Sequence, residues 1–272
     1  MKDNRKVLKE DKREKLKKEI KTTLQAAIRS FFLDKEVKVT HPLDLIFPKE
    51  RRVRSLIGGL ETSLGTTLWE PLAKIFAKNN GFEILDEKEF NASVPAIPRQ
   101  VMHELSDFKE KKLKNYSLLC SDYFNDITNL IQRKNIISSN STKIPKGEGI
   151  DIWLEKDGCE YLIDLKTVQI NAGSGPKFLE NILKWFTYRA LDNINNVDCL
   201  LGFPYNPHKK DYWEKEGGKI APLLKNKEAF VADDFWNILS GMEDTTEFIF
   251  EIFKELGEEN FGEEFDDIFY LN

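Results

Sequence analysis

The sequence predicts an α/β protein in which short strands alternate with helices around one hydrophobic core. Residues 147–166 read as two strands joined by the turn-forming pair Asp157-Gly158. The apolar stretch 197–205 reads as a buried strand, and the segment before it has apolar side chains at helical spacing. A chain of 272 residues with 40% hydrophobic content can bury a substantial core. We therefore expect one α/β domain with helical additions.

The N-terminal part of the chain is predicted to be helical up to a first strand. Helical spacing of apolar residues predicts a helix over 5–33. Proline is tolerated only in the first turn of a helix, so Pro71 places the start of the next helix between Thr66 and Glu70. A short strand is expected to follow at 82–85.

The remaining elements are read from the same signals. In order, we expect a loop at 94–100, helical segments across 104–136, a linker at 138–147, the hairpin, a helix at 176–191, a strand at 197–205 and further helices to the end.

The formal net charge of −5 is unevenly distributed along the chain. Residues 242–272 hold eleven Asp or Glu and one Lys, a net of −10, which leaves +5 on the rest. Residues 1–18 alone hold nine Lys or Arg against four acids. Such a basic segment is either a patch for a polyanion or a solvated helix.

Composition argues against several classes of protein. No apolar run reaches the length needed to span a bilayer, and the lysine-rich N-terminus has no signal-peptide character. The three cysteines and three histidines are scattered, which argues against a disulfide framework and a zinc site. We expect a cytoplasmic protein.

The hairpin at 147–166 has a well-constrained register. A two-residue turn at Asp157-Gly158 pairs Lys156 with Cys159, which places Asp151 directly opposite Asp164. One face of the hairpin is then wholly apolar, and the other face carries the two aspartates and, two residues further on, Lys166. Because strand side chains alternate with a period of two, a one-residue slip would destroy both faces.

Opposed carboxylates repel each other, and a bound cation removes that penalty. Mg²⁺ prefers such hard oxygen ligands, so Asp151 and Asp164 are candidate metal ligands. Lys166 on the same face is a candidate to orient or activate water or to stabilise phosphate charge. Gly149, opposite Lys166, is expected to leave room for a substrate. The alternative is an ordinary charged, exposed hairpin face.

The residues "GID…DLK" resemble the P-D…(D/E)-x-K signature of the restriction-endonuclease-like nuclease superfamily, with Ile150 where many members have proline. The resemblance implies an α-β-β-β-α-β core with a mixed sheet flanked by helices, helical additions at both ends and a helical insert. It also implies a metal site of Asp151, Asp164 and the backbone carbonyl of Leu165. Members often add an acidic residue from the helix before the first strand. Glu70 occupies that place, although a first-turn glutamate also complements a helix dipole.

Two blocks, "GGLETSLGTTLWEPLAK" and "DLKTVQINAGSGPK", resemble the TdeIII/MjaII-type group of Type II restriction endonucleases. That resemblance implies Mg²⁺-dependent cleavage of double-stranded DNA at a short site of the GGNCC kind, and a partner DNA methyltransferase that need not form a stable complex. A palindromic site would call for a homodimer. We expect a single nuclease domain over 1–272, with an N-terminal helical extension at 1–49, a catalytic core at 50–205 with a helical insert at about 87–143, and an acidic helical region at 206–272.

Several polar residues after the second hairpin strand are candidates for DNA phosphate contacts. "GSGPK" precedes a helix and is either a phosphate-binding loop with Lys177 or a simple capping turn. Lys184, Tyr188 and Arg189 are expected to lie off the apolar stripe of that helix, where they contact phosphates or simply face solvent. Gln169 and Asn171 could position water or backbone, or be a polar pair at a strand end.

The acidic C-terminal segment "EEFDDIFY" covers an apolar groove, mediates dimerisation, mimics DNA charge or is a solvated amphipathic tail. Two other functions remain open from sequence. One is a repair or recombination nuclease that reads DNA structure, and the other is a non-catalytic DNA- or protein-binding module with a vestigial hairpin.

Overall fold

The computed structural model describes residues 2–33, 35, 41–166 and 170–270. The chain divides into two compact units. The first unit consists of residues 1–75 and 244–272, and the second consists of residues 76–243.

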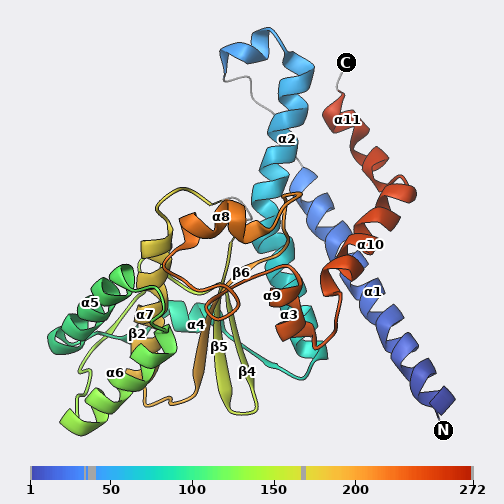
Figure 1. Ribbon diagram of the computed structural model, residues 1–272. Coiled ribbons are helices and arrows are strands. Elements are labelled where there is room, and N and C mark those ends of the chain that lie inside the picture. Colours follow the sequence, from blue (N-terminus) through green and yellow to red (C-terminus); the bar gives the residue numbers. More distant parts are fainter. Residues whose placement is uncertain (1, 34, 36–40, 167–169, 271–272) are drawn as a thin grey trace. The chain divides into compact units, whose positions relative to one another are not determined.

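The first unit is helical and contains both ends of the chain (Figure 1). Its elements are α1 (Lys2–Phe32), η1 (Pro42–Leu45), α2 (Pro48–Leu64), the π-helical segment η2 (Gly65–Trp69), the start of α3 (Glu70–Asn79), α10 (Thr245–Glu258), η3 (Phe261–Phe265) and α11 (Asp266–Phe269).

Helices α1 and α10 lie side by side and run in the same direction (Figure 1). Ion pairs join residues at constant spacing: Arg13 to Glu251 at 3.9 Å, Lys17 to Glu255, and Lys21 to Glu259 at 2.5 Å. Between them, apolar side chains of both helices are buried, among them Leu16, Ile20, Leu24, Phe248 and Ile252. Basic side chains of α1 from Arg13 onward and acidic side chains of α10 thus neutralise each other in one helix pair.

The aromatic side chains of the C-terminal segment are packed against the end of α1. The ring of Phe265 lies 4.6 Å from that of Phe32, and Arg29 pairs with Glu264 at 2.7 Å. Of the roles considered for the acidic C-terminal segment, the structure shows that it covers an apolar surface of the first unit.

The α-helix α3 begins at Glu70, within the predicted window, but it does not start a new helix, because α2 and the π-helical segment lead into it without a break. Pro71 lacks an N–H, and its ring would clash with the carbonyl four residues back in a regular helix. The π-helical turn at Gly65–Trp69 resolves this conflict, since the N–H of Glu70 donates to the carbonyl of Gly65, five residues earlier. Proline is therefore accommodated inside a helical run instead of starting one.

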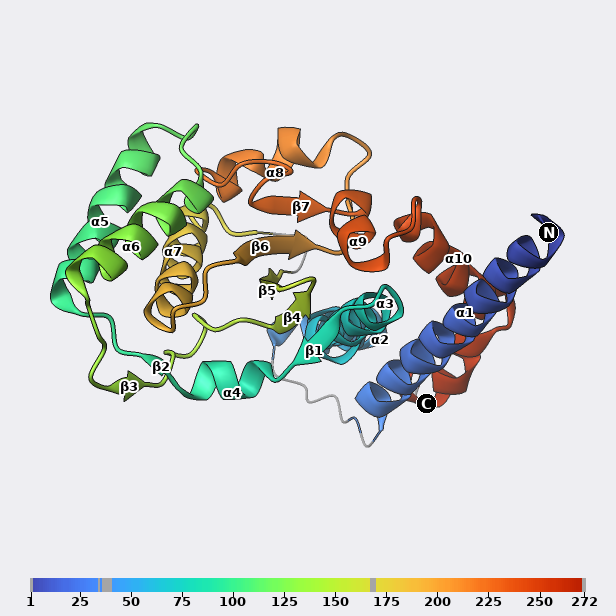
Figure 2. The same cartoon turned by 90° about the horizontal axis from the view of Figure 1, so that it is seen from below.

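The second unit is built on a mixed sheet of five strands in the order β1-β4-β5-β6-β7 (Figure 2). The strands are β1 (Glu83–Leu85), β4 (Ile152–Lys156), β5 (Cys159–Leu165), β6 (Val197–Phe203) and β7 (Ala229–Val231). The pairs β1–β4 and β4–β5 are antiparallel, whereas β5–β6 and β6–β7 are parallel. The predicted strands are confirmed, and β7 is an additional one.

Helices cover the sheet. They are α4 (Glu87–Ala92), α5 (Arg99–Lys114), α6 (Cys120–Lys134), α7 (Gly175–Leu191), α8 (Tyr212–Ile220) and α9 (Asp233–Ser240), together with the end of α3. A small second sheet pairs β2 (Val94–Pro95) with β3 (Ser141–Thr142), inside segments expected to be loops. The helical stretch expected at 104–136 is two helices, α5 and α6.

The central crossover helix α7 connects β5 to β6, as a parallel strand pair requires. It packs against β6 on one side and against α5 and α6 on the other. On the opposite face of the sheet Phe235 of α9 approaches β6 so closely that a Cβ on Gly202 would lie 2.5 Å from its ring. No helix among the described residues is both long and apolar enough to cross a membrane.

Candidate active site

The hairpin of β4 and β5 has the predicted register. Lys156 pairs with Cys159 and Ile152 pairs with Ile163, and the turn residues Asp157 and Gly158 have φ values of 53° and 77°. Positive φ at both positions is the requirement of a type I′ turn. The expected apolar face is buried: Ile152, Leu154 and Ile163 are all 0% exposed. The regular pairing ends at Ile152, and the N–H of Asp151 donates to the carbonyl of Ile163 at 2.9 Å, so Asp151 lies just outside the ladder in which the sequence placed it opposite Asp164.

The three predicted polar groups of this hairpin come together. Asp151 is near enough for its charge to raise the pKa of Asp164, and Lys166 Nζ forms an ion pair with Asp164 Oδ1. Asp151 Oδ2 also accepts a hydrogen bond from the N–H of Leu165 at 2.8 Å. One carboxylate is thus fixed by backbone and the other by an ammonium group.

The two carboxyl groups differ in exposure, and this sets their electrostatics. Asp164 is 2% exposed, while the Lys166 side chain is 35% exposed. Burial raises the pKa of Asp164 well above its ordinary value, the Lys166 ammonium opposes that rise, and the charge of Asp151 adds to it. The pair therefore favours a bound proton or another positive charge between its oxygens.

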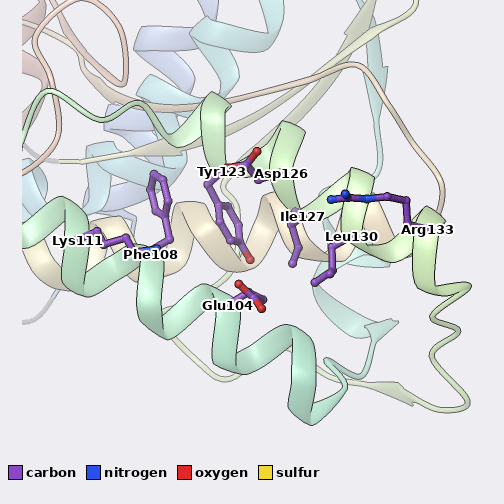
Figure 3. A pocket seen from close by; sticks show the side chains of 8 residues that line it. All are labelled: Glu104, Phe108, Lys111, Tyr123, Asp126, Ile127, Leu130 and Arg133. Atoms are coloured by element: carbon purple, nitrogen blue, oxygen red, sulfur yellow. The ribbon is translucent and has the colours of Figure 1, made fainter.

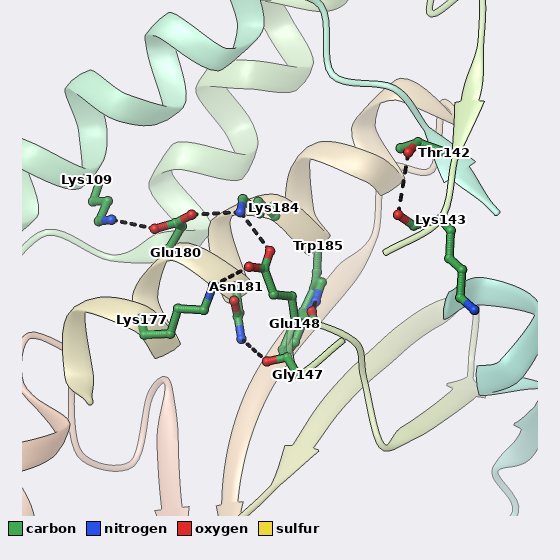
Figure 4. A network of polar contacts seen from close by, with 10 residues as sticks. All are labelled: Lys109, Thr142, Lys143, Gly147, Glu148, Lys177, Glu180, Asn181, Lys184 and Trp185. Atoms are coloured by element: carbon green, nitrogen blue, oxygen red, sulfur yellow. Dashed lines mark hydrogen bonds and ion pairs between the residues drawn. The ribbon is translucent and has the colours of Figure 1, made fainter. Parts of the chain in front are cut away.

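The segment just before Asp151 is fixed by side chains of α7 (Figure 4). Trp185 Nε1 donates to the carbonyl of Glu148 at 2.8 Å, and the Glu148 carboxylate pairs with Lys177 and with Lys184 at 2.9 Å. These two lysines lower the pKa of Glu148. The network extends through Lys184 to Glu180 at 2.7 Å, so α7 and the strand that carries Asp151 are joined by charge as well as by packing.

Asn91 of α4 makes a second set of contacts with this segment. Its Nδ2 donates to the carbonyl of Ile150 at 2.8 Å, and its Oδ1 accepts from the N–H of Ile150 at 3.0 Å. The expectation that Gly149 leaves room for a substrate is wrong, because that space holds the Asn91 carboxamide. A Cβ at position 149 would lie 2.4 Å from Asn91 Oδ1.

The candidate phosphate contacts on α7 are engaged with the protein itself. Lys177 and Lys184 pair with Glu148. Tyr188 is 5% exposed and Arg189 is 9% exposed, so the expectation that they lie off the buried stripe is wrong. The physical reason is that α7 is enclosed by β6, α5 and α6, which leaves its second half no solvent face.

The "GSGPK" glycine at 175 has a packing role, since a Cβ there would lie 1.8 Å from the carbonyl oxygen of Ala221. Asn171 is exposed in the loop before α7, where its carbonyl accepts from Ser174 Oγ at 2.9 Å. Gln169 lies outside the described residues. Glu70 lies at the start of α3 in the first unit, whereas the hairpin belongs to the second unit, so its role stays a prediction.

The donor set of the aspartate pair fits a hard divalent cation better than a soft one, because it consists of carboxylate oxygens. Among the described residues no group of three or more His, Cys, Asp or Glu side chains could hold a metal. A cation at Asp151 and Asp164 would therefore need backbone, water or phosphate oxygens to complete its shell. Mg²⁺ commonly binds in this way, through one or two carboxylates with retained water.

A separate cavity of about 240 Å³ lies between α5 and α6 (Figure 3). It is lined by Glu104, Phe108, Lys111, Tyr123, Asp126, Ile127, Leu130 and Arg133. None of the predicted site residues is among them. Tyr123 Oη is already bonded to Thr187 Oγ1 at 2.6 Å, which makes this residue part of the packing of α6 on α7.

Sequence reasoning missed Asn91 and Trp185, the two side chains that fix the backbone before Asp151. Asn91 is 59 positions away from Ile150, and an asparagine in a short helix gives no local signal of such a contact. The one available hint was Gly149, since a glycine inside a strand-like segment often marks close approach of another group.

Comparison with known proteins gives further evidence about the family of this chain. A family model described as "Type II restriction endonuclease, HinfI" matches residues 8–257. The chain is also 26% identical over 193 residues to the Type II restriction enzyme MjaII of Methanocaldococcus jannaschii, a match that covers 61% of this chain and 52% of the relative. The chain thus spans about half the length of that relative. No solved structure matches.

Proposed function

The chain belongs to the HinfI family of Type II restriction endonucleases, and from that premise we propose that it is a site-specific endodeoxyribonuclease whose active site is the aspartate pair of the hairpin. The observation that carries the proposal is that Asp151, Asp164 and Lys166 come together where β4 begins and β5 ends. Carboxylates can hold a metal ion that activates water and stabilises phosphate charge, and an amine beside them can orient that water.

We further propose that α3, β1, β4, β5, α7 and β6 form the restriction-endonuclease-like core. Their order along the chain is helix, three strands, helix and strand, which supports this assignment. The division into an extension at 1–49, a core at 50–205 with an insert at about 87–143, and an acidic region at 206–272 of a single nuclease domain stays a proposal.

In the proposed reaction, the Lys166 ammonium orients a water molecule whose oxygen attacks the phosphorus atom; the proton lost by this water passes to solvent, from which the leaving 3′-oxygen takes one up. The new P–O bond forms in line with the bond to the 3′-oxygen, which breaks and leaves as the 3′-hydroxyl end. The 5′-phosphate remains on the other fragment. Asp164 maintains the orientation of Lys166 through their ion pair.

Asp151, Asp164 and the backbone carbonyl of Leu165 would hold Mg²⁺, which when bound supplies Lewis acid stabilisation of phosphate charge and lowers the pKa of bound water. Glu70 stays a candidate further ligand from the sequence resemblance alone, because no third acidic side chain joins this pair among the described residues. The raised pKa of Asp164 supports cation binding, because a positive charge between the two carboxyl groups offsets both burial and mutual repulsion.

Double-stranded DNA is the proposed substrate, with a short recognition site of the GGNCC kind. A palindromic site supports a homodimer in which each subunit cuts one strand. A cognate DNA methyltransferase and a cytoplasmic location complete the proposal. Asn171 and Gln169 remain candidate phosphate contacts.

One digest tests the proposal. Incubation of a sequenced plasmid with the protein and Mg²⁺ should give discrete fragments with 5′-phosphate and 3′-hydroxyl ends, and EDTA should abolish cutting. Asp164→Ala should lower the cleavage rate by at least about 10³-fold and retain DNA binding in a gel-shift assay. Smears or branch-dependent cutting would point instead to a structure-selective nuclease. Binding by the wild type without Mg²⁺-dependent nicking would point to a non-catalytic module.

A further inference from the structure

The edge of the sheet next to Asp151 is completed by a side chain in place of a strand. β1 pairs with β4 through Leu85 opposite Trp153, and this register would place residue 88 opposite Ile150. The chain leaves the sheet before that point, because α4 begins at Glu87. The N–H and carbonyl of Ile150 therefore have no strand partner on that side, and the Asn91 carboxamide supplies both a donor and an acceptor to them.

The Asn91 contact fixes the peptide group that leads into Asp151. The carbonyl of Ile150 and the N–H of Asp151 belong to the same planar unit. Asn91 Nδ2 binds the carbonyl at 2.8 Å, and the Ile163 carbonyl accepts from the N–H at 2.9 Å. Because both polar ends are held, the plane cannot rotate, and the Cα position of Asp151 is set from two sides.

Asn91 also contacts the chain several residues before Asp151. Its backbone carbonyl accepts from the N–H of Ile144 at 3.1 Å. The absence of a side chain at Gly149 is what allows the carboxamide to reach Ile150, since an added Cβ would lie 2.4 Å from Oδ1 and 2.8 Å from Cγ. The carboxamide cannot swing aside without losing both of its hydrogen bonds to Ile150.

We propose that Asn91 is a positioning residue for Asp151 and that Gly149 acts only through it. Neither residue touches the reacting atoms; together they hold the first carboxylate in the geometry that the second requires. This inference rests on the proposed function for its catalytic consequence. The structural coupling between positions 91 and 149 does not depend on that function.

A double-mutant cycle tests the proposal with Asn91→Ala, Gly149→Ala and the double variant. Each single change breaks the same two hydrogen bonds. We expect each to lower the single-turnover cleavage rate by about 10- to 100-fold, as a displacement of about 1 Å at a catalytic group does. Each should also raise the Mn²⁺ concentration that half-saturates the DNA-free protein, followed by electron paramagnetic resonance. DNA affinity measured without metal should stay within about twofold.

The decisive measurement is the coupling. With Asn91 truncated, a Cβ at 149 meets no carboxamide, so the double variant should be no worse than the poorer single variant in cleavage, Mn²⁺ binding and thermal unfolding. Losses that multiply would overturn the proposal. So would wild-type Mn²⁺ binding and cleavage by Asn91→Ala.

Matched controls are available in the same unit. Asn129→Ala removes an exposed asparagine side chain from α6, and Gly218→Ala adds a Cβ that meets nothing within 4 Å in α8. Both should behave as wild type. If Asn91→Ala fails to fold, Asn91→Asp keeps the acceptor for the Ile150 N–H and loses only the donor, so it should show a smaller loss in the same direction. A wild-type protein that neither cuts DNA nor binds Mn²⁺ would contradict the proposed function, whereas an active wild type with an unaffected Asn91→Ala would contradict this inference alone.

Discussion

Buried carboxylates beside one another destabilise a fold unless a positive charge is near. Asp164 is almost fully buried, and its pKa is raised because burial and Asp151 both disfavour its charged form. Lys166 compensates in part through its ion pair. The hairpin thus keeps two acidic side chains at a position where apolar residues would stabilise the fold more. Active sites commonly hold such groups with strongly shifted pKa values.

Arg189 of α7 was a candidate DNA contact, and the structure indicates instead that it stabilises the fold. Its side chain is 10% exposed, donates from Nε and Nη2 to Glu160 at 2.9 and 2.7 Å, and lies 5.3 Å from the Trp153 ring. Arg189→Ala should lower the free energy of unfolding by about 3 kcal/mol, because the half-buried Glu160 loses its ionic partner and keeps only the hydrogen bond from Trp153 Nε1. Urea denaturation measures this change, with the exposed Arg133→Ala as control.

The same variant distinguishes a structural role from phosphate binding. The salt dependence of DNA affinity should keep its wild-type slope in Arg189→Ala. A slope reduced by about 0.9 would mean that one phosphate contact is lost, and would restore Arg189 to the DNA interface.

Among the elements, α7 carries the most interactions with the site, since its polar side chains reach the segment before Asp151. Glu180 lies at the centre of its charge network, with Lys109 and Lys184 each 2.7 Å away. These lysines lower the pKa of Glu180 from 4.5 to about 2. A carboxyl group whose pKa is depressed by folding stabilises the folded state above its unfolded pKa, and this contribution is lost as the pH falls through its folded pKa.

We therefore expect Glu180→Gln to be less stable than the wild type at pH 7 and the difference to shrink as the pH falls from about 4.5 towards 2. Urea unfolding of both proteins at pH 7 and pH 3 measures the two differences. Glu110→Gln, an exposed position on α5, serves as control. An equal difference at both pH values would contradict the assigned role of the lysine pairs.

The elements also show what the sequence could predict. The hairpin and its register followed from Asp157-Gly158 and a period of two, because both signals are local. The crossover helix and the strand at 197–203 had similarly strong apolar patterns. The two-residue strands at 94–95 and 141–142 are too short to give any pattern. The strand Ala229–Val231 was missed although β1, of the same length, was predicted.

Contacts between distant parts of the chain were beyond local signals. The carboxamide of Asn91 at Ile150, the enclosure of Arg189 and the π-helical turn before Pro71 each depend on what surrounds the residue in three dimensions. The spacing of apolar residues and the turn preferences of a segment describe one element at a time. They therefore predict that the two aspartates lie near each other, and they do not predict which distant side chains fix the backbone beside them.

At the scale of the whole molecule, the first unit joins residues from both ends of the chain and the second unit contains the sheet. Ile252 is fully buried in α10, the helix that packs on α1. Ile252→Ala should destabilise the first unit by about 2–5 kcal/mol through the lost apolar contacts and the cavity left behind.

Hydrogen exchange followed by mass spectrometry measures which regions of the chain this substitution destabilises. In Ile252→Ala, the amides of α1 and α10 should lose protection together while those of β5 and β6 keep theirs, because compact units open separately. In Leu201→Ala, which truncates a buried side chain of β6, the amides of β5 and β6 should lose protection while those of α1 and α10 keep theirs. A uniform loss over the whole chain in either variant would mean that the two units unfold as one.

The pairing of α1 with α10 has a consequence for how the protein is made. Helix α1 contacts α2 and η2, which follow it directly in the chain, but its contact with α10 can form only when residues 245–258 have been translated. At about 5–20 residues per second, a ribosome needs on the order of 10–40 seconds to synthesise the stretch between them. During that interval the ion pairs from Lys17 and Lys21 to Glu255 and Glu259 cannot form, so the first unit is completed only late in synthesis.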